Sequence, residues 1–143
     1  MTIIEGDILA VSHGVICHQV NCKHVMGAGL AAAIRKKYPR HYEDYMSRTA
    51  HLGGLVFTQV NNDLYIVGVY GQQEYGRDKR YTDYDALEKG LIAVGTFAQS
   101  LGLPVYLPYG IGCGLAGGDW EIVKTIVDKA LPDAIVIKKT VKG

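Results

Sequence analysis

The sequence predicts an α/β fold in which a mixed sheet is covered by helices on both faces. Three observations lead to this prediction. Apolar runs of strand length alternate along the chain with segments whose apolar residues recur at helical spacing. A length of 143 residues suits a single domain, residues 1–143, and a hydrophobic fraction of 48% is enough for its core. The 18 glycines cluster between apolar segments instead of forming a linker, which is typical of backbone that passes close to another group.

The first half of the chain is expected to hold two strands followed by two helices. We place the strands at Thr2–Glu5 and Val15–Val20, and the second is apolar enough to be buried on both faces of a sheet. Helical spacing of apolar residues then extends over Ala28–Lys37. The proline at position 39 ends this helix and suits the first turn of the next one, Pro39–Thr49.

The second half begins with a hairpin and continues with alternating helices and strands. Leu55–Val60 and Leu64–Tyr70 are separated by the turn-forming residues Asn61, Asn62 and Asp63. The elements expected after the hairpin are a helix capped by Asp83 and ending at Leu101, a strand at Pro104–Leu107, a helix at Trp120–Ala130 and a strand at Ala134–Lys138. The last residues, 138–143, are expected to fray.

Charge and composition argue against several classes of protein. The formal net charge is +1 and no long basic run is present, which argues against general nucleic-acid binding. No apolar stretch approaches the roughly 20 residues that cross a bilayer, and the first residues, MTIIEGD, do not resemble a signal peptide. We therefore expect a cytoplasmic monomer with no membrane partner. The three cysteines lie in apolar or glycine-rich segments and are expected to be reduced thiols.

Two glycine-rich loops follow expected strands. The first, Asn21–Gly29, lies between a buried strand and a helix N-terminus, where open α/β sheets bind ligands and free amides bind phosphate. A tight turn that needs glycine for its geometry alone explains a single loop of this kind equally well. The second, Tyr109–Asp119, has five glycines in the nine positions 110–118, and its N–H groups are able to wrap a pyrophosphate. Together the two loops favour a nucleotide-like ligand.

Two polar residues near these loops are candidates for the site. Asp7 follows the first expected strand and is able to accept a hydrogen bond from an exocyclic amine, although turns and caps are commoner roles for aspartate. His18 shares a strand face with Ile16 and Val20, so it is either a satisfied core residue or a site residue three positions before Asn21. The cysteines and histidines do not have the spacing of a structural zinc site, so we expect no metal and no cofactor.

The segment Gln72–Tyr84, QQEYGRDKRYTDY, is polar, aromatic and charged, and is a candidate lid over a ligand. The residues expected to contribute are Gln72, Gln73 and Tyr75, with Glu74, Arg77, Asp78 and Arg80 able to take part in chemistry or to hold a phosphate. An ordinary solvated loop is the alternative for any one of these residues.

Three motifs taken together resemble one known family. GDIL at Gly6–Leu9, HQVNCKHVMGAGLA at His18–Ala31 and IGCGLAGGDW at Ile111–Trp120 look like the macrodomains, and most like the subgroup that contains terminal ADP-ribose glycohydrolases. The resemblance covers nearly the whole chain in the right order. It implies a three-layer α/β/α sandwich with a mixed, about six-stranded sheet and an ADP-ribose cleft at the strand ends.

The same resemblance implies which residues contact the ligand. Asp7 would bind the adenine amine, Asn21 and Met26–Leu30 would contact the distal ribose and pyrophosphate, and Ile111–Gly117 would wrap the phosphates. The implied ligand-binding residues are Asp7, Ile8, Asn21, Met26, Gly27, Ala28, Gly29, Leu30, Ile111, Gly112, Cys113, Gly114, Leu115, Ala116 and Gly117.

The catalytic groups of this subgroup are not matched. Its glycohydrolases use a lysine on the loop after the fourth strand and an aspartate just after the GCGL motif. Here the lysine position falls near Gln72 or Gln73, and Ala116 follows Gly114-Leu115. Glutamine has no basic amine and cannot replace a lysine nucleophile. Asp119 lies three residues further along the chain.

A second resemblance keeps hydrolysis open. The yeast ADP-ribose-1″-phosphate phosphatase has the same fold and carries a histidine before an Asn-Cys pair, which matches His18 and Asn21-Cys22 here. This match favours His18 as an acid/base or water-positioning group. The candidate catalytic residues are therefore His18, Asn21 and Asp119.

Two functions follow from these observations. One is an enzyme that removes a group from the distal ribose of an ADP-ribose derivative, either a 1″-phosphate, an acetyl ester or a linkage to a macromolecule. The other is a reader that binds ADP-ribose or an ADP-ribosylated partner without turnover, which the absent lysine and aspartate favour. A nucleic-acid-binding or structural module is poorly supported by the net charge of +1.

Overall fold

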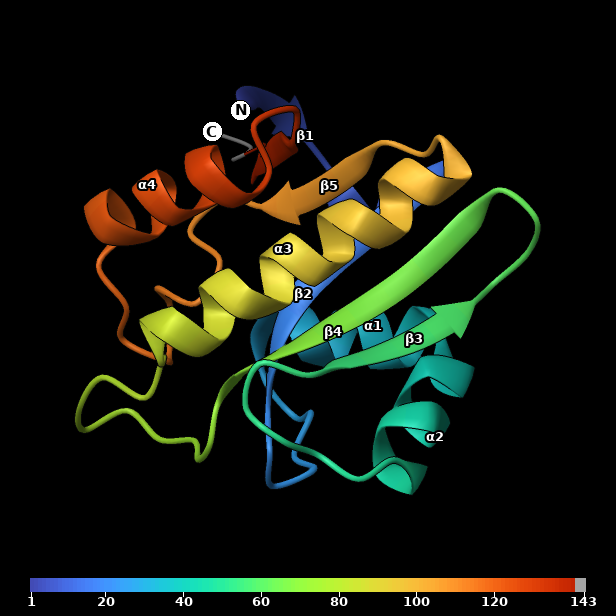
Figure 1. Ribbon diagram of the computed structural model, residues 1–143. Coiled ribbons are helices and arrows are strands. Elements are labelled where there is room, and N and C mark those ends of the chain that lie inside the picture. The colour runs from blue at the N-terminus through green and yellow to red at the C-terminus, as the bar shows by residue number, and fades with distance from the viewer. Residues whose placement is uncertain (141–143) are drawn as a thin grey trace.

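Six strands form one mixed sheet in the order β1-β6-β5-β2-β4-β3 in the computed structural model, which describes residues 1–140 (Figure 1). The strands are β1 (Thr2–Gly6), β2 (Gly14–Asn21), β3 (Leu55–Gln59), β4 (Leu64–Gln72), β5 (Val105–Pro108) and β6 (Ile135–Lys139). The helices are α1 (Gly29–Lys37), α2 (Pro39–Ser47), α3 (Tyr84–Leu101) and α4 (Trp120–Ala130), with a short 3-10 helix, η1 (Ile8–Ala10). Neighbouring strands are parallel except for the β3–β4 hairpin.

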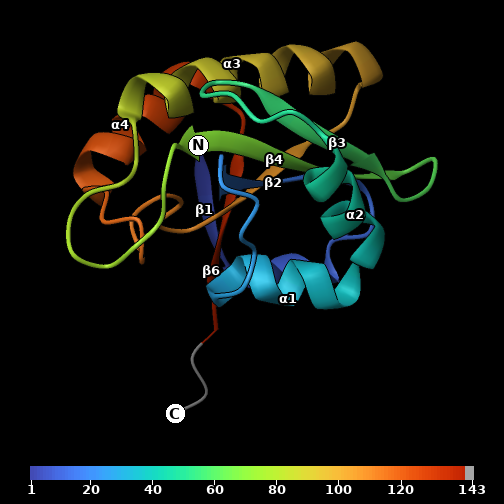
Figure 2. The same ribbon diagram turned by 90° about the horizontal axis from the view of Figure 1, so that it is seen from below.

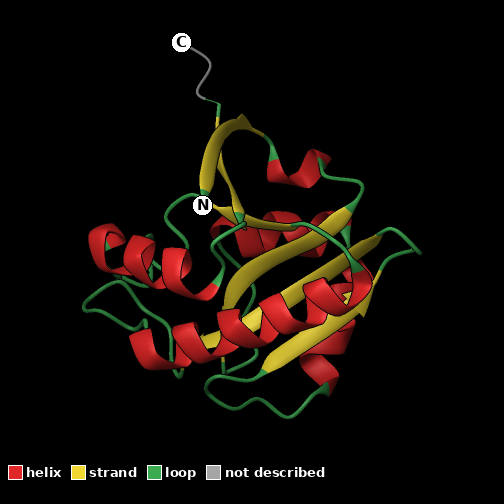
Figure 3. Cartoon of the chain, turned by 45° about the horizontal axis from the view of Figure 1, so that its top comes forward, coloured by secondary structure: helices red, strands yellow, loops and turns green. Residues whose placement is uncertain are grey.

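The helices cover the sheet in two layers. Helices α3 and α4 lie on one face and α1 and α2 on the other, with the sheet between them (Figure 2). Figure 3 shows the strands as one twisted sheet with helices on both sides. The α/β/α sandwich and the mixed six-stranded sheet expected from the sequence are confirmed.

Strand β2 lies at the centre of the sheet and shows how the core is divided. Its residues alternate between the faces because successive strand side chains point to opposite sides. Val15 and Cys17 pack with the apolar residues of α3 and α4, and burial raises the pKa of the Cys17 thiol. Ile16 packs with Ile34 of α1, and Val20 packs with Tyr45 of α2. The expected burial of this strand on both faces is confirmed.

The helix boundaries follow local capping chemistry. Asp83 accepts a hydrogen bond from Ala86 N at the start of α3, and Gly102 ends that helix in the left-handed conformation at φ 65°. Pro39 occupies the first turn of α2, as expected from its fixed φ.

The two ends of the sequence differ from the expectation in small ways. The sequence pattern did not reveal η1, because three residues are too short for a periodic signal. Lys138 and Lys139 belong to β6, because their backbone pairs with Glu5 and Gly6 of β1, so the expected fraying does not begin at residue 138. Residues 141–143, also expected to fray, lie outside the described residues.

Candidate ligand-binding cleft

A cleft of about 620 Å³ opens where β2 and β5 separate. The two strands pair only through Val15 with Val105 and Ile16 with Tyr106, and beyond these pairs they diverge. The chain leaves β2 for α1 on one face and leaves β5 for α4 on the other, so this is a topological switch point, where open α/β sheets bind ligands. The cleft is lined by His18, Gln19, Val20, Asn21, Val25, Gly27, Ala28, Gly29, Leu30, Ala31, Gln72, Tyr75, Gly76, Arg77, Pro108, Tyr109, Gly110, Ile111, Gly112, Gly114, Leu115 and Ala116.

The N-terminus of α1 forms one wall of the cleft without a cap of its own. Its N-cap is Ala28, which makes no side-chain hydrogen bond, and its first turn holds no acidic residue. The first N–H groups of a helix have no partner within the helix, so they are available to an anion. Nothing lies within 4 Å of a Cβ built on Gly27 or Gly29, so the space beside this backbone is open.

The second glycine loop forms the opposite wall. Its N–H groups at Gly112, Gly114, Leu115 and Ala116 donate no hydrogen bond to any group of residues 1–140. A Cβ built on Gly114 meets no atom within 4 Å, whereas Ile111 is buried and anchors the loop in the core beneath α4. The residues that carry these free backbone amides therefore line the same cleft from two sides.

Asn21 lines the cleft and also holds the first loop in shape. Its Oδ1 accepts a hydrogen bond from Lys23 N at 3.0 Å, and its Nδ2 donates to Val25 O at 2.8 Å. The Tyr45 hydroxyl lies 2.5 Å from Asn21 O and 2.9 Å from Oδ1, and donates its single hydrogen to this pair of acceptors. Burial raises the pKa of Tyr45, which keeps this hydroxyl protonated and able to donate. The Asn21 side chain is therefore fixed before any ligand arrives.

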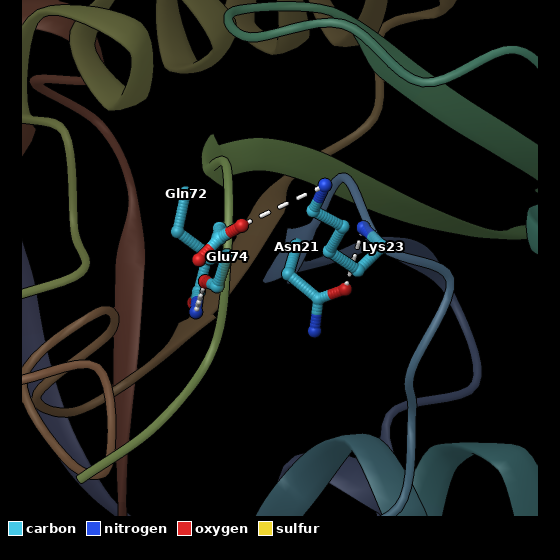
Figure 4. A network of polar contacts seen from close by, with 4 residues as sticks. All are labelled: Asn21, Lys23, Gln72 and Glu74. Atoms are coloured by element: carbon cyan, nitrogen blue, oxygen red, sulfur yellow. Dashed lines mark hydrogen bonds and ion pairs between the residues drawn. The ribbon is translucent and has the colours of Figure 1, made fainter.

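The lid segment, residues 72–82, is the first part of the candidate lid Gln72–Tyr84 and is attached on the side of the first loop. Cys22 N donates to Gln72 O at 3.0 Å, and Lys23 Nζ lies 3.6 Å from Glu74 Oε1 across the gap between the segments (Figure 4). Gln72 Nε2 donates to Glu74 O at 2.8 Å within the lid. The ion pair is exposed and contributes little by itself, so the backbone hydrogen bond from Cys22 carries most of this attachment.

The lid segment is also attached to the glycine loop. Tyr81 N and Thr82 N both donate to Ala116 O, at 2.7 and 3.2 Å. The Thr82 hydroxyl donates to Gly112 O at 2.6 Å, and Gln19 Nε2 donates to both Gln72 Oε1 and Thr82 Oγ1. Since both ends are fastened, the middle of the segment, Tyr75–Arg77, is held over the cleft.

Replacing Gly112 with alanine should destabilise the protein by about 1 to 2 kcal/mol. Its φ of 73° is left-handed, which costs an L residue about that much, and a Cβ would lie 2.9 Å from Gln19 Oε1 and 3.1 Å from Thr82 Oγ1. Urea unfolding would measure the change. The same substitution at Gly114, which has no positive φ and open space, is the control and should leave the free energy of unfolding within about 0.5 kcal/mol. Equal losses at both positions would contradict this assignment of roles.

His18 lines the cleft but is almost completely buried, at 2% exposure. Its Nε2 lies 2.9 Å from Nε2 of His41, and its Nδ1 has no hydrogen-bond partner within residues 1–140. Burial, with a smaller contribution from His41, holds the pKa of His18 well below its ordinary value. Burial likewise lowers the pKa of His41 to about 4, against an opposing effect of Asp44. Both rings are therefore neutral near pH 7.

Several residues that the sequence analysis assigned to the site do not line the cleft. Asp7 caps η1, its carboxylate accepting a hydrogen bond from Leu9 N, and Asp119 caps α4 by accepting one from Glu121 N. Both carboxylates thus have the capping role that is common for aspartate. Ile8 and Met26 are buried in the core, and Cys113, Gly117 and Gln73 also lie off the cleft wall. Of the charged residues considered in the lid, Arg77 alone is among the cleft-lining residues, and Glu74, Asp78 and Arg80 are not.

Gln19 and Tyr109 are among the cleft residues to which the sequence analysis assigned no ligand contact; the others include Val20, Val25, Ala31, Gly76, Pro108 and Gly110. Strand alternation places Gln19 on the face opposite His18. Both line the cleft because it opens at the end of the sheet, where β5 has diverged and both faces of β2 are accessible. The sequence signals for them were the place of Gln19 in the motif His18–Ala31 and of Tyr109 at the start of the loop Tyr109–Asp119.

Residues 1–140 show no sign of a metal site or of a membrane-spanning helix. No group of three or more histidine, cysteine, aspartate or glutamate residues is placed to hold a metal ion there. None of the helices has the length and apolar character needed to span a membrane. The three cysteines are free thiols, as expected.

The comparisons with known proteins agree with this geometry. No protein-family model matches the chain. A protein of unknown function from Bacteroides thetaiotaomicron is 30% identical and superposes with a TM-score of 0.84 over 97% of both chains. A macrodomain protein from Streptomyces coelicolor is 25% identical, with a TM-score of 0.76 over 99% of each chain. The chain is a macrodomain.

Two further proteins resemble this macrodomain. DarTG of Thermosipho africanus, solved in complex with ADP-ribose, shares the fold at a TM-score of 0.78 and 19% identity, over 99% of this macrodomain and 42% of that chain. An uncharacterised 17.5 kDa protein of Enterobacteria phage T4 is 29% identical over 137 residues, which cover 87% of this chain and 86% of the phage protein.

Proposed function

We propose that this macrodomain binds ADP-ribose, or a derivative of it, in the cleft between β2 and β5 and hydrolyses a group from the distal ribose. One observation carries the proposal: unsatisfied backbone amides from the α1 N-terminus and from residues 112–116 face one cleft of about 620 Å³. Such amides bind phosphates without lysine or arginine. A volume of this size is typical of small-molecule sites, and a protein of the same fold is known in complex with ADP-ribose.

The walls of the cleft also suit the uncharged parts of such a ligand. Val25, Leu30 and Leu115 supply apolar surface, and Tyr75 and Tyr109 supply exposed aromatic rings. Ribose and adenine rings pack on surfaces of this kind while a few polar groups fix their orientation. Asn21, held by its three partners, is the polar group best fixed for that task.

The hydrolytic part of the proposal rests on His18 and Asn21, which both line the cleft from strand β2. A neutral histidine is able to position or deprotonate a water molecule. The substrates that fit are ADP-ribose-1″-phosphate, O-acetyl-ADP-ribose and an ADP-ribosylated macromolecule, because each carries a cleavable group on the distal ribose.

A reader is the second candidate, and one observation favours it. Glutamines stand near the position where the glycohydrolases that this chain resembles have a lysine. The Gln72 side chain accepts a hydrogen bond from Gln19 and donates one to Glu74 O. Ala116 offers no carboxylate. A lysine nucleophile is therefore absent from this part of the cleft wall, and cleavage would depend on His18.

Calorimetry combined with product analysis separates the two candidates. ADP-ribose should bind at micromolar concentration, and one of the three substrate types should release phosphate, acetate or free ADP-ribose. His18→Ala should then lower the rate by about 100-fold or more, the range that general acid–base groups contribute. Binding with no product from any substrate would favour the reader, and an unchanged rate in His18→Ala would remove His18 from the mechanism.

A further inference from the structure

A buried chain of hydrogen bonds runs from the cleft wall to helix α2. His18 Nε2 lies 2.9 Å from His41 Nε2, and His41 Nδ1 lies 2.8 Å from Thr58 Oγ1. The Thr58 hydroxyl donates to Asp44 Oδ2 at 2.6 Å. His18, His41 and Thr58 are at most 3% exposed, whereas Asp44 is only half-buried. The chain links β2, α2 and β3, and α2 lies beside β3 (Figure 2).

The carboxylate at the end of this chain fixes the direction of every hydrogen bond in it. An ionised carboxylate only accepts, so Thr58 donates its single hydroxyl hydrogen to Asp44 and its oxygen accepts from His41 Nδ1–H. A neutral His41 then has only Nε2 free to accept, so His18 donates through Nε2–H. His18 Nδ1 is left as a bare acceptor with no partner among residues 1–140.

The unpartnered nitrogen belongs to a ring that lines the cleft, although the nitrogen atom itself is buried, so a donor reaches it only when the groups that cover it move. Buried polar atoms almost always have a partner, and one that lacks a protein partner beside a ligand cleft suggests a role toward the ligand. Here the missing partner must be a donor, which a ribose hydroxyl or a water molecule supplies.

We propose that Asp44, acting through Thr58 and His41, is a positioning residue that keeps His18 Nδ1 as the acceptor for a hydroxyl group bound in the cleft, and that the chain carries a proton from that hydroxyl to Asp44. This inference rests on the proposed function, since it assumes a ligand or water hydroxyl in this cleft.

The proton transfer is balanced at every atom of the chain. The hydroxyl proton moves to His18 Nδ1 and the Nε2 proton of His18 moves to His41 Nε2. The Nδ1 proton of His41 moves to Thr58 Oγ1, whose own proton moves to Asp44. Four bonds to hydrogen break and four form, and no buried imidazole remains charged. The cleft loses one proton, and Asp44, which is partly exposed, is able to return it to solvent.

This arrangement removes an obstacle to base catalysis by a buried histidine. Burial strongly disfavours a positive charge on His18 or His41, as the low pKa of both rings indicates. The titratable groups that act on the ring pair are the rings themselves and Asp44, and β3 contributes only the neutral hydroxyl of Thr58. A lone His18 would have to hold the proton as a cation, whereas the chain delivers it to a carboxylate.

Nitrogen-15 NMR of the imidazole rings tests the positioning directly. At pH 7 the two buried rings should both be neutral, with His18 protonated on Nε2 and His41 protonated on Nδ1. Thr58→Val preserves shape but removes the hydroxyl, so His41 should lose its single tautomer, and Thr58→Ser should restore it. Thr125→Val, which removes a hydroxyl bonded to Glu121 O on α4, is the control and should leave both rings unchanged. A proton on Nδ1 of His18, or an unaltered spectrum in Thr58→Val, would overturn the inference.

Ligand binding tests the acceptor role of His18 Nδ1, and turnover tests the proton transfer to Asp44. ADP-ribose should shift the Nδ1 resonance of His18 in the wild-type protein, and no shift on saturation would contradict the acceptor role. With the substrate that is turned over, Thr58→Val should lower kcat at least tenfold with KM within about twofold, and Thr58→Ser should retain most of kcat. An unchanged kcat in Thr58→Val, with wild-type turnover intact, would refute the proton transfer alone. Absence of turnover by the wild type would refute both the transfer and the hydrolytic function, and the NMR result would still decide the positioning.

Discussion

Gly114→Glu should weaken ADP-ribose binding at least 100-fold, a loss of about 2.7 kcal/mol or more, while the protein remains folded. A Cβ at position 114 meets no protein atom within 4 Å, and Gly114 has no positive φ, so the fold has no reason to resist a side chain there. The same open space belongs to the cleft, and a glutamate would place bulk and negative charge where we propose that phosphates bind. Calorimetry would measure the affinity and circular dichroism the fold.

The control for this substitution is Asn62→Glu, which adds the same charge in the exposed turn between β3 and β4. That turn precedes the first residue of β4, Leu64, whereas the cleft lies at the opposite end of the strand, at Gln72. Affinity should therefore change less than about twofold, since charges more than a Debye length of roughly 10 Å apart are largely screened. Full affinity in Gly114→Glu would exclude the second glycine loop from the site.

The stability of the protein should fall by more than about 2 kcal/mol between pH 7 and pH 5. In the unfolded chain His41 takes up a proton near the ordinary pKa of 6.5, but in the folded protein its pKa is about 4. Unfolding therefore binds protons in this window, and stability is lost as pH falls. His41 alone accounts for about 2 kcal/mol at pH 5, and His18, whose pKa is also lowered by burial, adds to the loss.

Urea unfolding at several pH values would measure this dependence. His41→Gln removes one of the two titrating rings, so it should make the protein less stable at pH 7 but reduce the slope of stability against pH between 7 and 5. A stability that is flat over this range would show that the two rings are accessible to protons in the folded protein, and would also remove the basis for the neutral hydrogen-bonded chain.

The order and type of the main elements could be predicted from local pattern. The apolar run of β2, the helical spacing in α3 and the capping residue Asp83 each act over a few neighbouring residues, which a sequence displays directly. The two glycine-rich loops were likewise visible, and the switch point places both at one cleft.

The details of the site depend on contacts between residues far apart in the chain. His18 and His41 are separated by 23 positions, and Gln19 and Thr82 by 63, so no local pattern reveals either pair. The divergence of β2 from β5 is also a property of the whole sheet, and it brings Gln19 and His18, on opposite faces of one strand, to the same cleft. Asp7 and Asp119 both cap helices, and an aspartate that caps a helix and one that contacts a ligand look alike in sequence, so local pattern does not separate the two roles.

A crystal structure with ADP-ribose bound tests the central claim most directly. The diphosphate should lie within hydrogen-bond distance of backbone amides from residues 27–31 on one side and 112–116 on the other, with the distal ribose beside Asn21 and His18. A ligand bound elsewhere, or a folded protein that shows no ADP-ribose at millimolar concentration, would contradict the assignment of the cleft between β2 and β5 as the ligand site.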